Sequence, residues 1–165
     1  MEHQHLIIRA EVLNPPTDNK FIEDWLIDLV GQLGMKVAAG PISSYVTKKG
    51  NRGITAAILI ETSHIVIHVW DEKNPSLIQL DVYTCSNLDV ERTIDHLGIF
   101  NPVKVEYKFL NRNTELIVID EGGTHGSNRT EERLDNNGIQ RNTIQFSKNT
   151  RRRMVHQMES SNKES

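Results

Sequence analysis

Residues 61–70 read ETSHIVIHVW, a stretch in which polar and apolar side chains alternate. In a β-strand, successive side chains point to opposite faces, so this alternation predicts a strand with one buried face and one polar face. The buried face holds Ile65, Ile67 and Val69, and the polar face holds His64, Val66, His68 and Trp70. We therefore expect a strand over residues 64–70 that lies on a hydrophobic core.

A second stretch, residues 77–85, has the same two-residue period. Leu80 and Val82 share one face, and the opposite face carries Asp81, Tyr83 and Cys85. Two neighbouring strands that present ionisable side chains on the same face form a candidate site.

The remaining elements follow from apolar spacing and from turn residues. Further strands are expected over residues 5–12, 36–47, 53–61, 103–110 and 115–119. One helix is expected over residues 18–34, with Asp18 or Asn19 as its cap and Gly34 as its end, and a second over residues 88–97, with Ser86 or Asn87 as its cap and Gly98 as its end. This irregular alternation predicts an α+β fold, a two-layer α/β sandwich with a mainly antiparallel sheet and two main helices packed on one face.

Length and composition narrow the class of protein. A chain of 165 residues with 37% hydrophobic residues suits one domain, which we place at residues 1–120. Residues 121–165 are rich in polar residues and carry one aromatic residue, Phe146, so we expect a disordered tail there. The net charge of -3 gives no general attraction to nucleic acid or to an anionic membrane, and no apolar stretch is long enough to span one.

Cys85 is the single cysteine, so no intramolecular disulfide can form, and we expect a cytoplasmic protein. A lone cysteine is most often a small buried hydrophobe, and a histidine in a strand is most often structural. His64 and His68 are four residues apart, which in a strand separates them by about 13 Å, and no third ligand stands at a familiar spacing. We therefore expect no metal site.

The chain resembles the bacterial and archaeal S-adenosylmethionine decarboxylases over residues 5–110. The run that carries the resemblance starts at Gly53 and includes Ser63-His64, His68, Trp70 and Asp81-Val82-Tyr83-Thr84-Cys85. The family has a Ser-Glu-Ser-His segment, then an Ile-His-Thr-Trp-Pro-Glu-like strand and an Asp-Val-Phe-Thr-Cys-Gly-like strand, in the same order and with similar spacing.

The resemblance implies a proenzyme that cuts itself between Thr62 and Ser63. The Ser63 hydroxyl would attack the Thr62 carbonyl in an N-to-O acyl shift, and elimination and hydrolysis would turn Ser63 into a pyruvoyl group. His68 matches the family histidine that carries protons during processing. Thr55 occupies the position of the family's second processing hydroxyl.

The resemblance also implies the reaction of the finished enzyme. The pyruvoyl group would bind the substrate as a Schiff base, with no external cofactor, and Cys85 would return a proton to the α-carbon. Trp70 and Glu72 fall at family positions near the substrate. The implied substrate is S-adenosylmethionine, whose decarboxylated product is the aminopropyl donor for spermidine and other polyamines, and the implied assembly is a homodimer with sites between protomers.

Two alternatives remain open. One is a pyruvoyl-dependent decarboxylase of the same fold that acts on another amino acid, such as ornithine or arginine. The other is an unprocessed, non-catalytic homologue that acts as a binding subunit, because Thr62 stands where the family has a glutamate directly before the serine.

Overall fold

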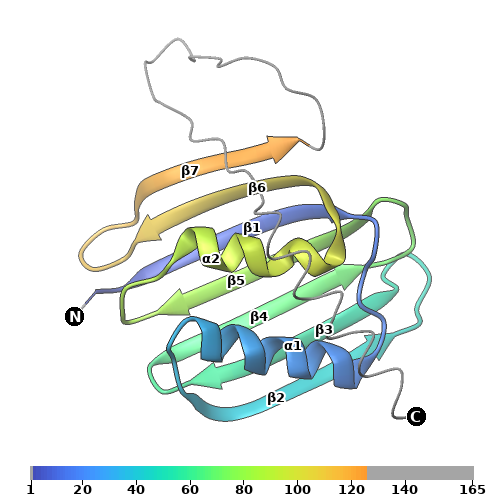
Figure 1. Ribbon diagram of the computed structural model, residues 1–165, viewed down its shortest axis with the longest axis horizontal. Coiled ribbons are helices and arrows are strands. Elements are labelled where there is room, and N and C mark those ends of the chain that lie inside the picture. Colours follow the sequence, from blue (N-terminus) through green and yellow to red (C-terminus); the bar gives the residue numbers. More distant parts are fainter. Residues whose placement is uncertain (1, 126–165) are drawn as a thin grey trace.

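The computed structural model describes residues 2–125, which form one seven-stranded sheet with two helices (Figure 1). The strands lie in the order β2-β3-β4-β5-β1-β6-β7, and every neighbouring pair is antiparallel. The elements along the chain are β1 (Gln4–Val12), α1 (Asn19–Gln32), β2 (Val37–Val46), β3 (Gly53–Ile60), β4 (Ser63–Trp70), β5 (Ser76–Thr84), α2 (Val90–His96), the 3-10 helix η1 (Leu97–Phe100), β6 (Pro102–Asn111) and β7 (Ile117–His125).

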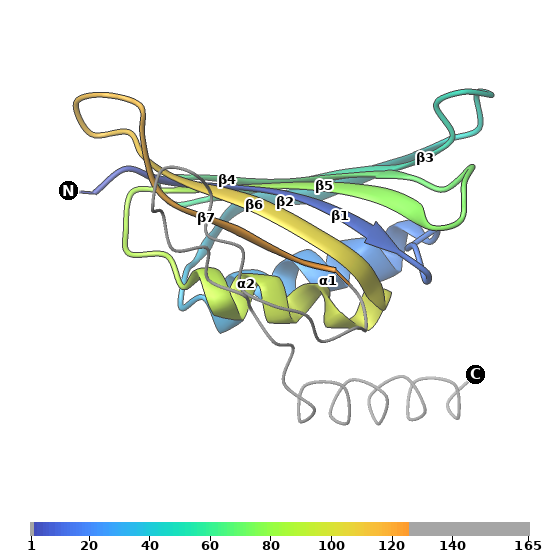
Figure 2. The ribbon, with the colours of Figure 1, turned by 90° about the horizontal axis from the view of Figure 1, so that it is seen from above.

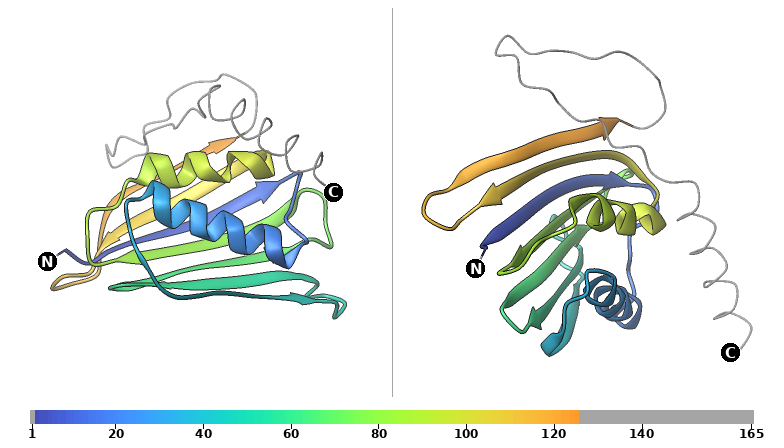
Figure 3. Two further views of the ribbon diagram at one scale, coloured as in Figure 1. Left: turned by 60° about the horizontal axis from the view of Figure 1, so that its bottom comes forward. Right: turned by 60° about the vertical axis from the view of Figure 1, so that its left-hand side comes forward.

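Both helices pack on the same face of the sheet, and Figure 2 shows that no described element covers the opposite face. Figure 3 shows α1 and α2 side by side over one face of the sheet. These observations confirm the predicted two-layer α+β fold. No helix within residues 2–125 is long and apolar enough to span a membrane.

The predicted alternation along the central strands is confirmed by their burial. In β4, Ile65, Ile67 and Val69 are buried, whereas the residues between them are half-exposed. In β5, Leu80 and Val82 are buried in the same way. The hydrophobic core therefore lies between the sheet and the helices, and the polar side chains of both strands line the uncovered face.

Helix α1 forms as the sequence predicts. The Asp18 side chain accepts a hydrogen bond from the Phe21 backbone N–H at 2.7 Å and caps the first turn. Its buried stripe faces the sheet and consists of Ile22, Trp25, Leu26, Leu29 and Val30. Gly34 follows the helix with φ +68, a left-handed conformation that favours glycine, so the chain can turn back toward β2.

Helix α2 differs from the prediction at both ends. Its cap is Asp89, which accepts from the Arg92 N–H at 2.9 Å, and not Ser86 or Asn87. Leu88 precedes this cap, and its backbone N–H donates to the Gln4 side chain at 2.7 Å. The chain also continues past Gly98 as η1 and turns at Asn101, whose φ is 52.

Strand β7 extends to His125, so residues 121–125 belong to the sheet and not to a disordered tail. The Tyr107 hydroxyl of β6 donates to the Asp120 carboxylate at 2.8 Å and fastens the two strands together. At Gly123 a Cβ atom would lie 2.5 Å from the Val105 carbonyl oxygen, so the close pairing with β6 requires a glycine there. The sequence predicted a strand over residues 115–119 but missed its extension to His125, because an edge strand needs few apolar residues. The rest of the predicted tail lies outside the described residues.

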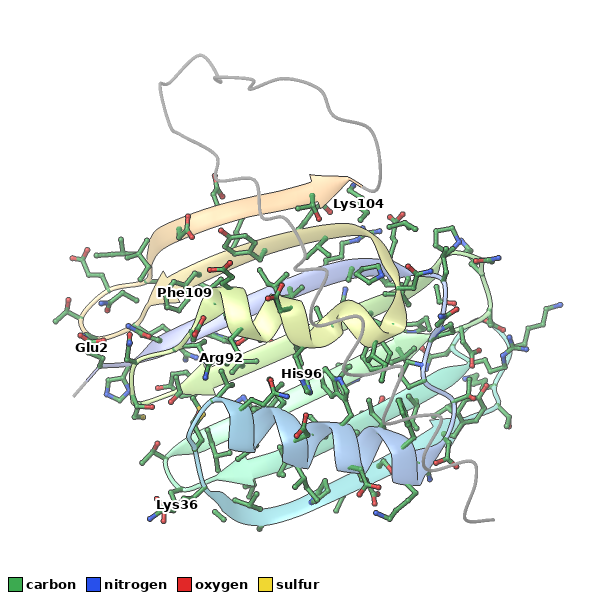
Figure 4. All side chains as sticks on the ribbon, in the orientation of Figure 1. Glu2, Lys36, Arg92, His96, Lys104 and Phe109 are labelled. Atoms are coloured by element: carbon green, nitrogen blue, oxygen red, sulfur yellow. The ribbon has the colours of Figure 1, made fainter. Side chains whose placement is uncertain are left out.

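His96 of α2 is buried between the two helices (Figure 4). Its Nε2 lies 3.2 Å from the Trp25 backbone oxygen, and its ring packs on the Trp25 indole with 4.7 Å between centroids. Burial lowers the pKa of His96, and the hydrogen bond to Trp25 and the charge of Asp28 oppose this shift only in part. The folded chain therefore favours the neutral ring with its proton on Nε2.

We expect the His96 Hε1 resonance to titrate with a midpoint below the ordinary value of about 6.5 in an NMR pH titration. Since the unfolded chain binds this proton more readily, the free energy of unfolding should fall as the pH drops below about 6.5. The His96→Gln variant identifies the resonance and keeps an N–H donor for the Trp25 oxygen. A midpoint at or above the ordinary value would contradict this account of the helix pair.

Candidate active site

The first group of predicted site residues gathers where β4 begins and β5 ends. These strands are antiparallel, and His64 lies opposite Tyr83, so Cys85 sits beside the turn that leads into β4. The Cys85 thiol donates to the Thr62 carbonyl oxygen, with Sγ and O 3.1 Å apart. This contact brings together Thr62 and Cys85, which are 23 residues apart in the chain.

Ser63 begins β4 directly after that carbonyl. Its Oγ is buried and has no hydrogen-bond partner among the described residues. A buried hydroxyl without a partner costs about 1–3 kcal/mol, so native structures rarely keep one without a reason. This hydroxyl and the Thr62 carbonyl belong to the two residues that the Thr62–Ser63 peptide bond joins.

The second group lies further along the same strands. Thr55 of β3 is opposite His68 of β4, and its Oγ1 is 3.0 Å from the His68 Nδ1. The Trp70 ring lies 5.9 Å from the His68 ring, and its Nε1 donates to the Asn51 side chain at 2.8 Å. These side chains form one polar cluster on the uncovered face of the sheet.

Glu72 lies near this second group, just after β4. Its carboxylate accepts from the Gly50 backbone N–H at 2.9 Å. This bond joins the turn between β2 and β3 to the turn between β4 and β5. Next to it, Asp71 accepts from the Arg52 guanidinium at 2.6 Å and from the Tyr45 hydroxyl. Burial alone would raise the pKa of Asp71, but these two hydrogen bonds outweigh it and lower the pKa, so the carboxylate stays charged and anchors the turn.

The two groups are not in contact within one chain. His68 is five residues beyond Ser63 along β4, which corresponds to about 16 Å at 3.3 Å per residue. Ser63 and Cys85 therefore lie at one end of these strands, and Thr55, His68, Trp70 and Glu72 lie toward the other.

Sequence reasoning missed a residue that contacts Cys85, namely His3. Its Nδ1 is 2.9 Å from the Tyr83 hydroxyl and 3.4 Å from the Cys85 Sγ. No sequence signal pointed to it, because it lies before the predicted first strand and more than 80 residues from Cys85. The extension of β1 to Gln4 and its pairing with β5 bring it there.

Other ionisable side chains surround the Tyr83 ring. The Arg112 guanidinium lies over the ring, 4.4 Å from its centroid. The Arg112 Nη1 is 3.2 Å from the His5 Nδ1. The His5 Nε2 is 3.2 Å from the Asp81 carboxylate. Burial lowers the pKa of His5. Asp81 raises this pKa, but the charges of Arg112 and His64 lower it further, so the ring is mainly neutral at pH 7.

Within residues 2–125, no group of three or more His, Cys, Asp or Glu side chains is arranged to hold a metal ion. This face instead presents hydroxyl, thiol and imidazole groups in contact, with Thr55 beside His68 and Cys85 beside His3. Such groups carry out nucleophilic attack and proton transfer.

Comparisons with known proteins identify the family. The family model described as S-adenosylmethionine decarboxylase matches residues 4–113. The "S-adenosylmethionine decarboxylase proenzyme" of Pyrococcus horikoshii is 31% identical over 135 residues, which cover 79% of this chain and 91% of that protein. The protein of the same name from Pyrococcus abyssi is 30% identical over the same shares of both chains.

A solved structure supports the fold independently. The adenosylmethionine decarboxylase from Aquifex aeolicus superposes with a TM-score of 0.52 at 22% identity, covering 81% of this chain and 98% of that one. The family match spans both groups of site residues and the whole central sheet. The chain belongs to the S-adenosylmethionine decarboxylase family.

Proposed function

We propose that this chain is a proenzyme that cleaves itself between Thr62 and Ser63 and then decarboxylates S-adenosylmethionine. The observation that carries the proposal is that the buried Ser63 hydroxyl, which has no hydrogen-bond partner within residues 2–125, directly follows a Thr62 carbonyl that accepts a hydrogen bond from Cys85. The substrate follows from the family and from the names of the relatives.

The residues present fit the making of a pyruvoyl group at position 63. The Ser63 oxygen adds to the Thr62 carbonyl carbon, and negative charge develops on the oxygen that the Cys85 thiol contacts. The peptide C–N bond then breaks and leaves an ester and a free amine on Ser63. Loss of the Ser63 α-proton expels the Thr62 carboxylate, and hydrolysis of the resulting enamine releases ammonia and leaves the ketone.

The Thr62 side chain takes no part in the contact that supports this attack. The β-branched side chain restricts its own χ1, but the reacting atoms are the Thr62 carbonyl and the Ser63 hydroxyl. The thiol contact at 3.1 Å is made to the carbonyl oxygen and not to the side chain. A glutamate at this position is therefore dispensable for placing the oxygen beside its donor.

The pyruvoyl ketone supplies an electron sink for the electrons left behind when a bound amino acid loses carbon dioxide. Cys85 lies beside position 63 and is the proton donor for the α-carbon in this proposal. Trp70 offers an aromatic wall and Glu72 a carboxylate, features that suit a purine nucleoside with ribose hydroxyls and a positive sulfonium centre. Decarboxylated S-adenosylmethionine would serve polyamine synthesis as an aminopropyl donor.

The separation of the two groups supports a homodimer. His68 and Thr55 cannot transfer protons to Ser63 across about 16 Å of the same strand. Cys85 and the Thr55–His68 pair lie on the uncovered face, and Cys85 contacts the Thr62–Ser63 linkage at one end of it. Two copies packed face to face about a two-fold axis would place the Thr55–His68 pair of one protomer over this end of its partner. Exposed apolar side chains on this face, Ile7 at 42%, Ile42 at 70% and Leu59 at 53%, would be covered by such packing.

Intact mass spectrometry under denaturing conditions tests the self-cleavage. The purified chain should give two fragments, residues 1–62 and residues 63–165, with a ketone at the start of the second because Ser63 has lost its amino group. Ser63→Ala lacks the nucleophile and should stay intact. A wild-type chain that remains whole after prolonged incubation would favour the non-catalytic binding subunit instead.

Co-expression of two inactive variants tests the shared site. His68→Ala alone should cleave at least about tenfold more slowly, because it lacks the proton carrier. When it is co-expressed with a differently tagged Ser63→Ala chain, mixed dimers contain one site with Ser63 from the first chain and His68 from the second. The His68→Ala chain should then be cleaved, and the absence of any rescue would show that each site is built from one protomer.

A further inference from the structure

We propose that His3 is a positioning residue that holds the Cys85 thiol through its Nδ1 and restores the thiol proton after each turnover. The inference rests on the proposed function, in which Cys85 gives a proton to the substrate's α-carbon. It adds to that function a residue at the very start of the chain, outside the run of residues that carries the family resemblance.

His3 is held in place by its backbone. Its N–H donates to the Asn113 side-chain oxygen at 2.6 Å, and its carbonyl oxygen accepts from the Arg112 N–H at 2.8 Å. Its ring stacks on Tyr83 with 6.2 Å between centroids and 23° between planes. These three contacts indicate a fixed position for the ring.

The Cys85 sulfur has polar contacts with two partners. Sγ is 3.1 Å from the Thr62 oxygen, to which the thiol donates, and 3.4 Å from the His3 Nδ1. A thiol has one hydrogen, so it cannot donate to both partners at once. His3 is therefore placed to give a proton to the sulfur whenever the thiol hydrogen has gone elsewhere.

The proton balance gives this contact a purpose. When the substrate loses carbon dioxide, its α-carbon keeps the electron pair and takes the proton from the Cys85 thiol, which becomes a thiolate. Protonated His3 then transfers its Nδ1 proton to the thiolate and becomes neutral. His3 is only half-buried, so it regains a proton from water, and one proton is taken up for each carbon dioxide released.

The neighbouring charged and titratable groups act on other partners. Tyr83 is shared between the His3 Nδ1 and the Arg112 guanidinium above its ring, and the rings of His5 and His64 also contact Tyr83. Asp81 is bound to His5, and Glu2 accepts from Gln4. Of the charged and titratable side chains around Tyr83 in residues 2–125, His3 is the one with a polar contact to the Cys85 Sγ.

The single cysteine makes the contact measurable without any turnover. In a Ser63→Ala chain, which cannot cleave, the rate of iodoacetamide alkylation reports Cys85 alone, and it depends on the fraction of thiolate. Adding His3→Asn keeps a polar group near the Nδ1 position but removes the imidazole that would pass a proton to the sulfur. We expect alkylation at pH 7 to slow about threefold and its pH profile to move to higher pH.

His5→Asn in the same Ser63→Ala background is the matched control, because His5 is on the same strand face and contacts Tyr83 but not the sulfur. Its alkylation profile should follow that of the Ser63→Ala parent. Identical profiles for the parent and the His3→Asn chain would overturn the inference, and so would an equal shift in the His5→Asn control.

Steady-state kinetics of the fully cleaved enzyme then test the proton return. His3→Asn should lower kcat about tenfold and leave KM within about twofold, because His3 acts after the substrate has bound. An unchanged kcat would overturn the proton return even if the alkylation profile shifts. A wild-type chain that never cleaves would defeat the proposed function, and the alkylation profiles would still decide whether His3 acts on the thiol.

Discussion

The antiparallel register of β4 and β5 is the constraint on which the site depends. It places the end of β5 beside the start of β4, so that the Cys85 thiol reaches the carbonyl of Thr62 at 3.1 Å. A slip of one residue would send the ionisable side chains into the core and the apolar ones to the uncovered face. The buried Ile65, Ile67, Leu80 and Val82 oppose such a slip, because each would leave the core. Packing on one face of the sheet thus determines the chemistry available on the other.

The same register explains why the predicted residues form two groups. Thr55 pairs with His68 across β3 and β4, and this pair is set back from Ser63 by five residues of extended chain. Within one protomer the sheet keeps the proposed nucleophile, Ser63, apart from the proposed proton carrier, His68, and the uncovered face gives a second copy somewhere to pack. A shared site would link assembly to activation, because in a lone chain Ser63 lies about 16 Å from the Thr55–His68 pair.

The sequence predicted what depends on local pattern. The two-residue period located β4 and β5 and their buried faces, and Asp18 located the start of α1 because its cap is three residues from its partner. The misses depend on contacts between distant segments. Leu88 bonds to Gln4 ahead of α2, and Gly123 lets β7 pair closely with β6 as far as His125. A local window can detect neither contact. His3 was missed for the same reason, and the roles of the site residues themselves came from the family resemblance.

The central claim, that position 63 becomes the reacting group for S-adenosylmethionine, is tested most directly by reductive trapping. The purified protein is incubated with sodium cyanoborohydride and, in separate samples, with S-adenosylmethionine, ornithine or arginine, and each fragment is then weighed by mass spectrometry. The account predicts that the substrate, or its decarboxylated form, becomes covalently attached to the fragment that begins at residue 63 and leaves residues 1–62 unmodified. Attachment of ornithine or arginine but not of S-adenosylmethionine, or no attachment at residue 63 at all, would contradict it.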